Sequence, residues 1–316
     1  MKDLMAEFLA SKRQAGLARS TIEQYGWHLR ELSVWLAEQG IDDVDAVSRS
    51  LLRRWGGSLH DRWQAQTIKT AVVVCRSFFS WCVEEEVITA NPADGLKTPP
   101  VRMRLQRTLT AVEITRLLDT CDLETTKGVR DAALVSLLAD SGLRAGEMLR
   151  LRPADLDLDS RTTTMVRKGG NQGVAFYGEA TAERLRTWLD VRTKLVTLLA
   201  PGVSALWVAV GGYAPGQPIT ESGMRVLLRK LGAEAGVPKV APHAFRRAWA
   251  CMLVEAGAPP RFIQGAAGWK SERQLYRYTQ GLDLHRMASQ YSPMDRLASN
   301  QPVQLPLWSD LPSDKT

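Results

Sequence analysis

Apolar residues recur every three or four positions through the first ninety residues, the spacing of one buried helix face. In the second such segment Ile22, Leu29 and Leu36 share a face, and Ser20 with Glu23 three positions later predicts a capping box at its start. The pattern therefore predicts a bundle of four helices. Their expected bounds are residues 3–11, 20–39, 49–55 (ending before Gly56-Gly57) and 63–85, the last with Ala71, Val74, Phe78 and Cys82 on its buried face.

The pattern becomes mixed in the second part of the chain. Residues 161–167 and 174–177 are rich in Thr, Val and other strand-forming residues and flank Gly169-Gly170, which predicts a small antiparallel sheet. Helical spacing returns on both sides of this sheet. Helices are expected at residues 111–120, 127–139, 143–151, 180–199, 220–235, 243–256, 260–267, 272–278 and 284–291.

Prolines mark a boundary between these two parts. Asn91-Pro92 and Thr98-Pro99-Pro100 interrupt any helix. We therefore expect two domains joined by a linker and followed by a flexible tail. Their expected bounds are 1–94 for the helical domain, 95–107 for the linker, 108–298 for the second domain and 299–316 for the tail.

Charge and cysteine usage narrow the class of protein. The formal net charge is +7, and the excess lies after residue 100, where 29 Lys and Arg face 21 Asp and Glu. This basic half favours a polyanionic partner. The four cysteines lack CxxC spacing, so neither zinc nor a disulfide framework is expected. Without a signal-peptide layout or a long apolar run, a cytoplasmic protein with no membrane partner is predicted.

Four short motifs lie in the basic half, and each has an ordinary explanation by itself. Arg144 and Glu147 are spaced like a surface helix pair, Lys168 like a turn lysine, and Trp269 like a core residue. An HxxR sequence on a helix is also found often without a catalytic role, with the histidine near the helix cap. The motifs are Gly142-Leu143-Arg144-Ala145-Gly146-Glu147, Lys168-Gly169-Gly170, Pro242-His243-Ala244-Phe245-Arg246, and Gly268-Trp269 with Tyr278-Thr279.

Taken together and in this order, the motifs resemble the active site of the tyrosine recombinases, the integrase family that cuts and rejoins DNA. Transfer of a phosphodiester without metal or ATP needs a nucleophile, cations on the phosphoryl oxygens and an acid for the leaving oxygen. The resemblance assigns these tasks to seven residues. They are Arg144, Arg246 and His243 at the phosphate, Trp269 as a further N–H donor, Lys168 as general acid, Glu147 as an orienting carboxylate and Tyr278 as nucleophile.

Some positions depart from the usual pattern or compete for a role. Trp269 stands where His is more common, and Arg247 and Gln280 stand where many members have His. Tyr276 is a second candidate nucleophile. The spacing of nine residues from Trp269 favours Tyr278, with Tyr276 expected to pack against the domain body.

Basic residues outside the motifs are candidate DNA contacts. Arg62, Lys69 and Arg76 are seven residues apart, so they are expected to share one face of the fourth helix, which either is an ordinary solvated face or lies against the major groove. The resemblance favours the groove. The linker arginines are expected to hold phosphates as well; they are Arg102, Arg104 and Arg107.

The resemblance implies a mainly α fold with a small antiparallel β-sheet. A helical, SAM-like core-binding domain and an α+β catalytic domain would form a C-shaped clamp on double-stranded DNA. The enzyme would recombine specific sites through a 3′-phosphotyrosine and a Holliday junction without a cofactor, for integration and excision of a mobile element or for dimer resolution. It would be monomeric when free and a homotetramer in the synapse, with residues 284–291 docked on a neighbouring protomer.

Two alternatives use the same fold. A type IB topoisomerase shares the chemistry but relaxes supercoils with little site preference, and a regulator with a decayed site would bind DNA without cutting it. The helical first domain argues against the former and the filled motif positions against the latter. The sequence leaves open the target site and the need for an accessory directionality factor or a second recombinase.

Overall fold

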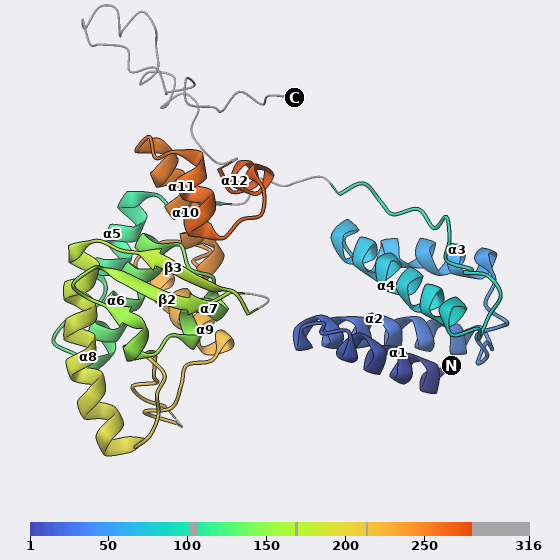
Figure 1. Ribbon diagram of the computed structural model, residues 1–316, viewed down its shortest axis with the longest axis horizontal. Coiled ribbons are helices and arrows are strands. Elements are labelled where there is room, and N and C mark those ends of the chain that lie inside the picture. Colours follow the sequence, from blue (N-terminus) through green and yellow to red (C-terminus); the bar gives the residue numbers. More distant parts are fainter. Residues whose placement is uncertain (102–106, 168–169, 213, 280–316) are drawn as a thin grey trace, which may run out of the picture. The chain divides into compact units, whose positions relative to one another are not determined.

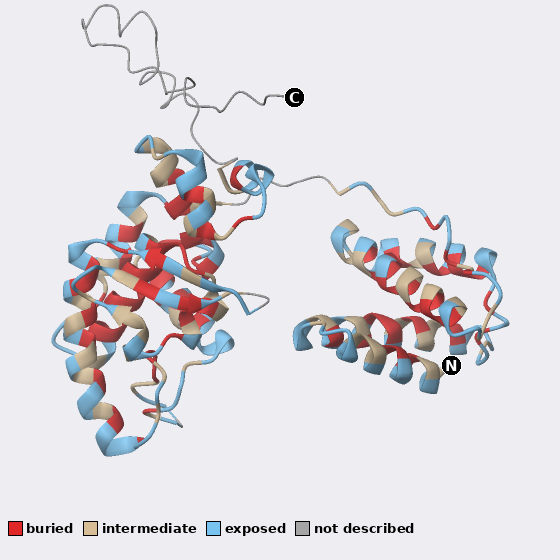
Figure 2. Cartoon of the chain, in the orientation of Figure 1, coloured by how far each residue is buried: buried red, intermediate tan, exposed pale blue. Residues whose placement is uncertain are grey.

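The computed structural model describes residues 1–101, 107–167, 170–212 and 214–279 of the 316-residue chain (Figure 1). The chain divides into two compact units, Met1–Arg104 and Leu105–Thr316, and each is considered by itself. Each unit has its own apolar core, seen in Figure 2 as red segments on the inward faces of the helices. Within the described ranges, no helix is long and apolar enough to cross a membrane.

The first unit is a four-helix bundle, as the apolar spacing predicts. Phe8 and Phe78 lie at its centre, fully buried, with ring centroids 5.6 Å apart in an edge-to-face arrangement. All four residues predicted to line the inner face of the last helix are buried. The elements are α1 (Lys2–Gln14), α2 (Arg19–Glu38), α3 (Arg49–Ser58), the 3₁₀ turn η1 (Leu59–Asp61) and α4 (Ala65–Glu84).

Several helix boundaries in this unit differ from the prediction by one to three residues, and two of them have a clear physical reason. Helix α2 begins at Arg19 after Ala18, without a side-chain cap, so the predicted capping box at Ser20 is wrong. Helix α3 continues through Gly56 and Gly57 to Ser58. Burial of Trp55 before the glycines and of Leu59 after them holds this last turn, and such packing outweighs the low helix propensity of glycine.

The second unit combines a small sheet with helices. Strands β1 (Leu156–Asp157), β2 (Thr162–Val166) and β3 (Gln172–Phe176) form an antiparallel sheet in the order β1-β2-β3, with Thr162 opposite Phe176 and Val166 opposite Gln172. In Figure 1 the strands lie across α6 and α7. The helices are α5 (Ala111–Asp119), α6 (Thr126–Ser141), α7 (Ala145–Arg150), η2 (Pro153–Asp155), α8 (Glu179–Leu199), α9 (Glu221–Glu234), α10 (Pro242–Glu255), α11 (Pro260–Ala267) and α12 (Glu272–Thr279).

Helix α6 is the centre of this unit. It is buried along most of its length and packs against α8 and α10. The mainly helical fold with a small antiparallel sheet is thus confirmed. One predicted helix is too long, because Leu143 and Arg144 precede α7 and Arg144 has an extended backbone (φ −72°, ψ 151°). The predicted helix at 284–291 lies outside the described residues.

Candidate active site

The first arginine motif lies at a sharp turn between α6 and α7. Helix α6 ends at Gly142 in the left-handed region (φ +60°), where glycine is favoured. A Cβ at Gly142 would also lie 2.4 Å from ring atoms of Trp249 on α10, so there is no space for a side chain. The turn therefore needs glycine for two reasons, and it places Arg144 at the start of α7.

Glu147 fixes the position of Arg144. The carboxylate is buried, with 4% of the residue exposed; Oε1 accepts a hydrogen bond from Arg144 Nη1 at 2.8 Å and Oε2 from its main-chain N–H at 2.9 Å. The Arg144 side chain remains 34% exposed. The guanidinium is thus anchored on one side and open to a bound anion on the other. These are the contacts that an orienting carboxylate would make, and the catalytic role of Glu147 stays a prediction.

The second arginine, Arg246 on α10, is almost completely buried (1% exposed). It donates from Nη1 to the carbonyl of Gly142 at 2.5 Å and from Nη2 to that of Ala267 at 2.6 Å. Burial, and to a smaller extent the nearby positive charge of Arg144, lowers its pKa to about 10, while Tyr278 opposes the shift. The positive charges of the two arginines repel each other, so an anion bound between them is favoured because it offsets this repulsion.

Tyr278 completes a cluster with this arginine. Its ring centroid lies 4.8 Å from that of Trp269, and the guanidinium carbon of Arg246 lies 5.3 Å from the Trp269 ring and 5.7 Å from the Tyr278 ring. Trp269 is 5% exposed and Tyr278 half-buried. Tyr276 is 68% exposed, so the expectation that it packs against the domain body is wrong.

His243 lies exposed in the first turn of α10, three residues before Arg246. Although its surface is exposed, neighbouring protein atoms displace part of the water around the ring and lower its pKa, and the charges of Arg247, Arg246 and Arg144 lower it further. The imidazole is therefore neutral at pH 7, with one nitrogen able to donate and the other able to accept a hydrogen bond.

The hairpin that carries Lys168 is described on both sides of that residue, whereas Lys168 itself lies outside the described residues. Its neighbour Arg167 donates from its main-chain N–H to the carbonyl of Asn171 at 2.8 Å. The side chain of Arg167 extends to α11, and Arg150 of α7 reaches the carbonyl of Val166. Neither arginine is predicted from the sequence, because nothing in the motifs marks them.

The three basic residues assigned to one face of the fourth helix do not share it. Arg62 precedes α4 and pairs with Glu31 at 3.0 Å. Arg76 is half-buried and donates to the carbonyl of Leu96. Of these three residues, Lys69 alone is both part of α4 and exposed, so the prediction of a shared basic face is wrong.

Among the linker arginines, Arg102 and Arg104 lie outside the described residues. Arg107 contacts the carboxylate of Glu113 and the carbonyl of Pro238. Its own carbonyl accepts hydrogen bonds from Arg247 at 2.8 and 3.0 Å. These contacts indicate a structural role for Arg107 at the edge of the second unit.

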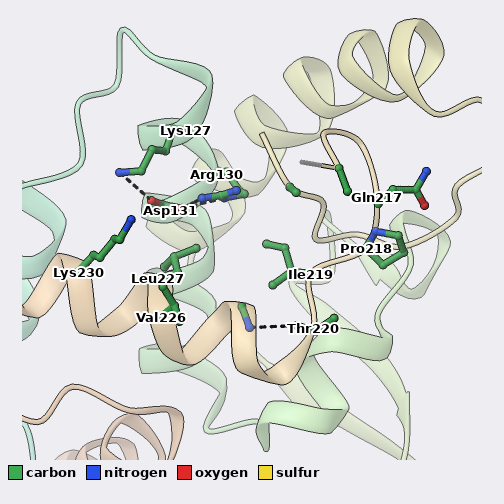
Figure 3. A pocket seen from close by; sticks show the side chains of 13 residues that line it. Lys127, Arg130, Asp131, Gln217, Pro218, Ile219, Thr220, Val226, Leu227 and Lys230 are labelled. Atoms are coloured by element: carbon green, nitrogen blue, oxygen red, sulfur yellow. Dashed lines mark hydrogen bonds and ion pairs between the residues drawn. The ribbon is translucent and has the colours of Figure 1, made fainter. Parts of the chain in front are cut away.

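A separate cavity of about 320 Å³ lies between α6, α9 and the segment before α9 (Figure 3). Its lining is mainly apolar, with Lys127 and Lys230 beside it and the Arg130–Asp131 pair behind. Burial raises the pKa of Asp131 despite the opposing effect of Arg130. None of the arginine, tryptophan or tyrosine residues of the candidate site lines this cavity. Across the described ranges, no cluster of His, Cys, Asp and Glu could hold a metal ion.

Comparison with known proteins decides the family. The sequence profile of the phage integrase family matches residues 107–285, and that of the phage integrase N-terminal SAM-like domain matches residues 6–86. The chain belongs to the phage integrase family. It is thus a tyrosine recombinase, a site-specific recombinase that cleaves and rejoins DNA strands.

Relatives and solved structures agree with this assignment. The recombinase is 27% identical over 299 residues to tyrosine recombinase XerD of Staphylococcus haemolyticus (93% of this chain, 99% of the relative). It is 29% identical over 294 residues to tyrosine recombinase XerC of Xylella fastidiosa strain M23 (92% and 96%).

Two structures of DNA complexes share the fold of the recombinase. XerH site-specific recombinase bound to its palindromic difH substrate has a TM-score of 0.69 at 17% identity, covering 90% of this chain and 82% of that chain. The Tn1549 transposon integrase in complex with a circular intermediate DNA has a TM-score of 0.67 at 18% identity (93% and 99%).

Proposed function

We propose that Tyr278 is the nucleophile of this recombinase. Its hydroxyl oxygen attacks the scissile phosphate of double-stranded DNA and releases its proton to water, the bond from phosphorus to the 5′-oxygen breaks, and a 3′-phosphotyrosine forms. Lys168 gives its proton to the leaving oxygen. The covalent intermediate conserves the energy of the phosphodiester, so that a second 5′-hydroxyl can attack and exchange strands through a Holliday junction without ATP.

The observation that carries this proposal is the different placement of the two tyrosines. Tyr278 lies against Trp269 and the guanidinium of Arg246, whereas Tyr276 on the same helix is 68% exposed. Of the two tyrosines, Tyr278 is the one next to the proposed phosphate-binding group.

The remaining groups stabilise the charge on phosphorus. Arg144 and Arg246 hold the non-bridging oxygens, and Glu147 keeps Arg144 in place. Trp269 can add one indole N–H bond and the neutral His243 one imidazole N–H bond. Each preorganised donor of this kind contributes about 10²- to 10³-fold to the rate.

We further propose how the recombinase engages and synapses DNA. The helical domain at residues 1–94 and the catalytic domain at 108–298 both contact the duplex, with Lys69 as a contact from α4. A homotetramer forms in the synapse through residues 284–291, and the protein acts in the cytoplasm. The DNA complexes of XerH and of the Tn1549 integrase support a duplex substrate. The biological role is integration and excision of a mobile element or resolution of dimers.

A covalent-trapping experiment tests the nucleophile. A duplex bound by the recombinase is selected from a random-sequence pool and nicked near the cleavage position, so that the short leaving strand diffuses away and the protein stays on the DNA. We expect a denaturation-resistant adduct from the natural protein and from Tyr276→Phe, and none from Tyr278→Phe. An adduct that persists in Tyr278→Phe, or is absent only in Tyr276→Phe, would overturn the assignment.

A further inference from the structure

We propose that Arg167 is a positioning residue that fixes the β2–β3 hairpin so that the adjacent Lys168 delivers its proton to the leaving oxygen. The inference rests on the proposed function, because it takes Lys168 as the general acid. It assigns a task to a side chain outside the four motifs. The placement of Arg167 itself comes wholly from described residues.

The guanidinium of Arg167 bridges almost a hundred residues of sequence. Nη1 donates to the carbonyl of Gly265 at 3.2 Å and Nη2 to the carbonyl of Ala266 at 2.9 Å, both in the last turn of α11. The last carbonyls of a helix carry partial negative charge, so a guanidinium binds them well. The carbonyl of Gly265 also accepts from the main-chain N–H of Gly268 at 3.0 Å. The end of the hairpin is thus tied to the end of α11.

The same turn of α11 binds the catalytic centre. The next carbonyl, that of Ala267, accepts from Arg246, and Trp269 follows two residues later. Three consecutive carbonyls therefore hold the residue before Lys168 and the proposed phosphate ligand Arg246. The residue next to the proposed proton donor is therefore held by the same turn as the arginine proposed to bind the phosphate.

Two glycines leave room for the Arg167 side chain. A Cβ at Gly173 on β3 would lie 2.1 Å from Arg167 Nε, and one at Gly268 would lie 1.8 Å from Arg167 Nη1. Gly268 also has a left-handed backbone (φ +63°), whereas Gly173 has no positive φ. Space alone therefore explains glycine at position 173, and a methyl group there would displace the guanidinium without removing it.

A second arginine, on the helix that begins within the first arginine motif, also contacts the hairpin. Arg150 on α7 donates from Nη2 to the carbonyl of Val166 at 3.2 Å. Arg144 lies at the start of the same short helix. The residues just before Lys168 are thus bonded to α7, which follows Arg144, and to the turn of α11 that accepts from Arg246.

A substrate whose leaving group needs no acid tests this inference. In a duplex with sulfur in place of the bridging 5′-oxygen, the leaving group is a thiolate, whose conjugate acid has a pKa of about 8.5, far below that of the alcohol formed from the natural 5′-oxygen. Loss of the general acid then matters little. Single-turnover cleavage of nicked oxygen and sulfur duplexes is compared for Arg167→Ala, Gly173→Ala, Lys168→Ala and Arg144→Ala.

We expect Arg167→Ala and Gly173→Ala to slow cleavage of the oxygen duplex by about 10- to 100-fold, the effect of a misplaced catalytic group. On the sulfur duplex, the cleavage rates of both variants should come within about threefold of the rate of the natural protein. The rate of Lys168→Ala should be restored in the same way. The sulfur duplex should not restore the rate of Arg144→Ala, because Arg144 acts on the phosphate. Arg184→Ala is the matched control, because Arg184 also donates to a main-chain carbonyl, that of Ala180 at 3.2 Å.

The outcomes separate the two proposals. If sulfur fails to restore Lys168→Ala, the general-acid role of Lys168 is wrong. If sulfur restores Lys168→Ala but neither Arg167→Ala nor Gly173→Ala, or if these two variants cleave the oxygen duplex at the natural rate, the positioning role of Arg167 is wrong. Restored cleavage of the sulfur duplex also shows that the variants are folded.

Discussion

Among the described residues, the buried arginines of this recombinase lie in the second unit and none lies in the first. In the first unit Arg19 and Arg62 are exposed and form surface pairs with glutamates. In the second, Arg246 and Arg192 are buried and donate to main-chain carbonyls. A surface pair contributes little to stability, whereas a buried guanidinium must have its hydrogen bonds satisfied.

The placement of the motif arginines in the second unit could be predicted from the sequence, whereas that of the basic residues near α4 in the first unit could not. The motifs of the second unit combine a fixed order with specific chemistry, and the structure brings Arg246, Trp269 and Tyr278 together. In the first unit, the prediction of a shared basic face rested on a seven-residue spacing alone. Such a spacing places residues on one face only if a single helix runs through all of them. Helix α4 begins at Ala65, after Arg62, and Arg76 turns to Leu96.

The largest effect is expected when the two buried arginines are exchanged for alanine. Arg246→Ala should slow cleavage by about 10²- to 10³-fold, and both Arg246→Ala and Arg192→Ala should lower the free energy of unfolding by about 1–3 kcal/mol, because buried carbonyls lose their donors. Arg192 donates to Ala205 and Val203 instead of to the site. Single-turnover cleavage and urea unfolding measure the two properties; equal cleavage by both variants would contradict the comparison.

A smaller effect is expected from two basic residues of α4. Lys69→Ala should weaken DNA binding and lower the slope of log affinity against log salt by about one, as for loss of one phosphate contact. Arg76→Ala should leave that slope unchanged and lower the free energy of unfolding by about 1–3 kcal/mol, because the Leu96 carbonyl loses its donor. Fluorescence anisotropy between 50 and 200 mM salt provides the slopes. An unchanged slope for Lys69→Ala would remove α4 from the DNA interface.

The smallest effect concerns His243 and pH. Its folded-state pKa lies below the unfolded value of 6.5, so the unfolded chain binds the proton more readily. The contribution of this residue to stability is therefore present above pH 6.5 and is lost as the pH falls through the folded pKa. His243→Gln should make the melting temperature less dependent on pH between 7.5 and 5.5 than it is in the natural protein. An identical dependence in both proteins would show that His243 has no such shift.

Local pattern was sufficient for most of the fold. Apolar spacing predicted the helices of both units, and Gly169-Gly170 between strand-forming segments predicted the hairpin, because these elements depend on short-range periodicity. The errors lie where packing overrides local preference. Trp55 and Leu59 hold helix α3 together through two glycines, and Ser20 caps nothing because the helix begins earlier.

The sequence by itself determined the reaction class, since Arg144, His243, Arg246 and Tyr278 occur in the order and spacing that this chemistry uses. Only the tertiary structure decided which tyrosine faces Arg246 and which carbonyls hold Arg167. Residue identity and order are linear properties of the chain. Contacts between residues about a hundred positions apart, by contrast, depend on how α6, α10 and α11 pack, and no local pattern encodes that packing.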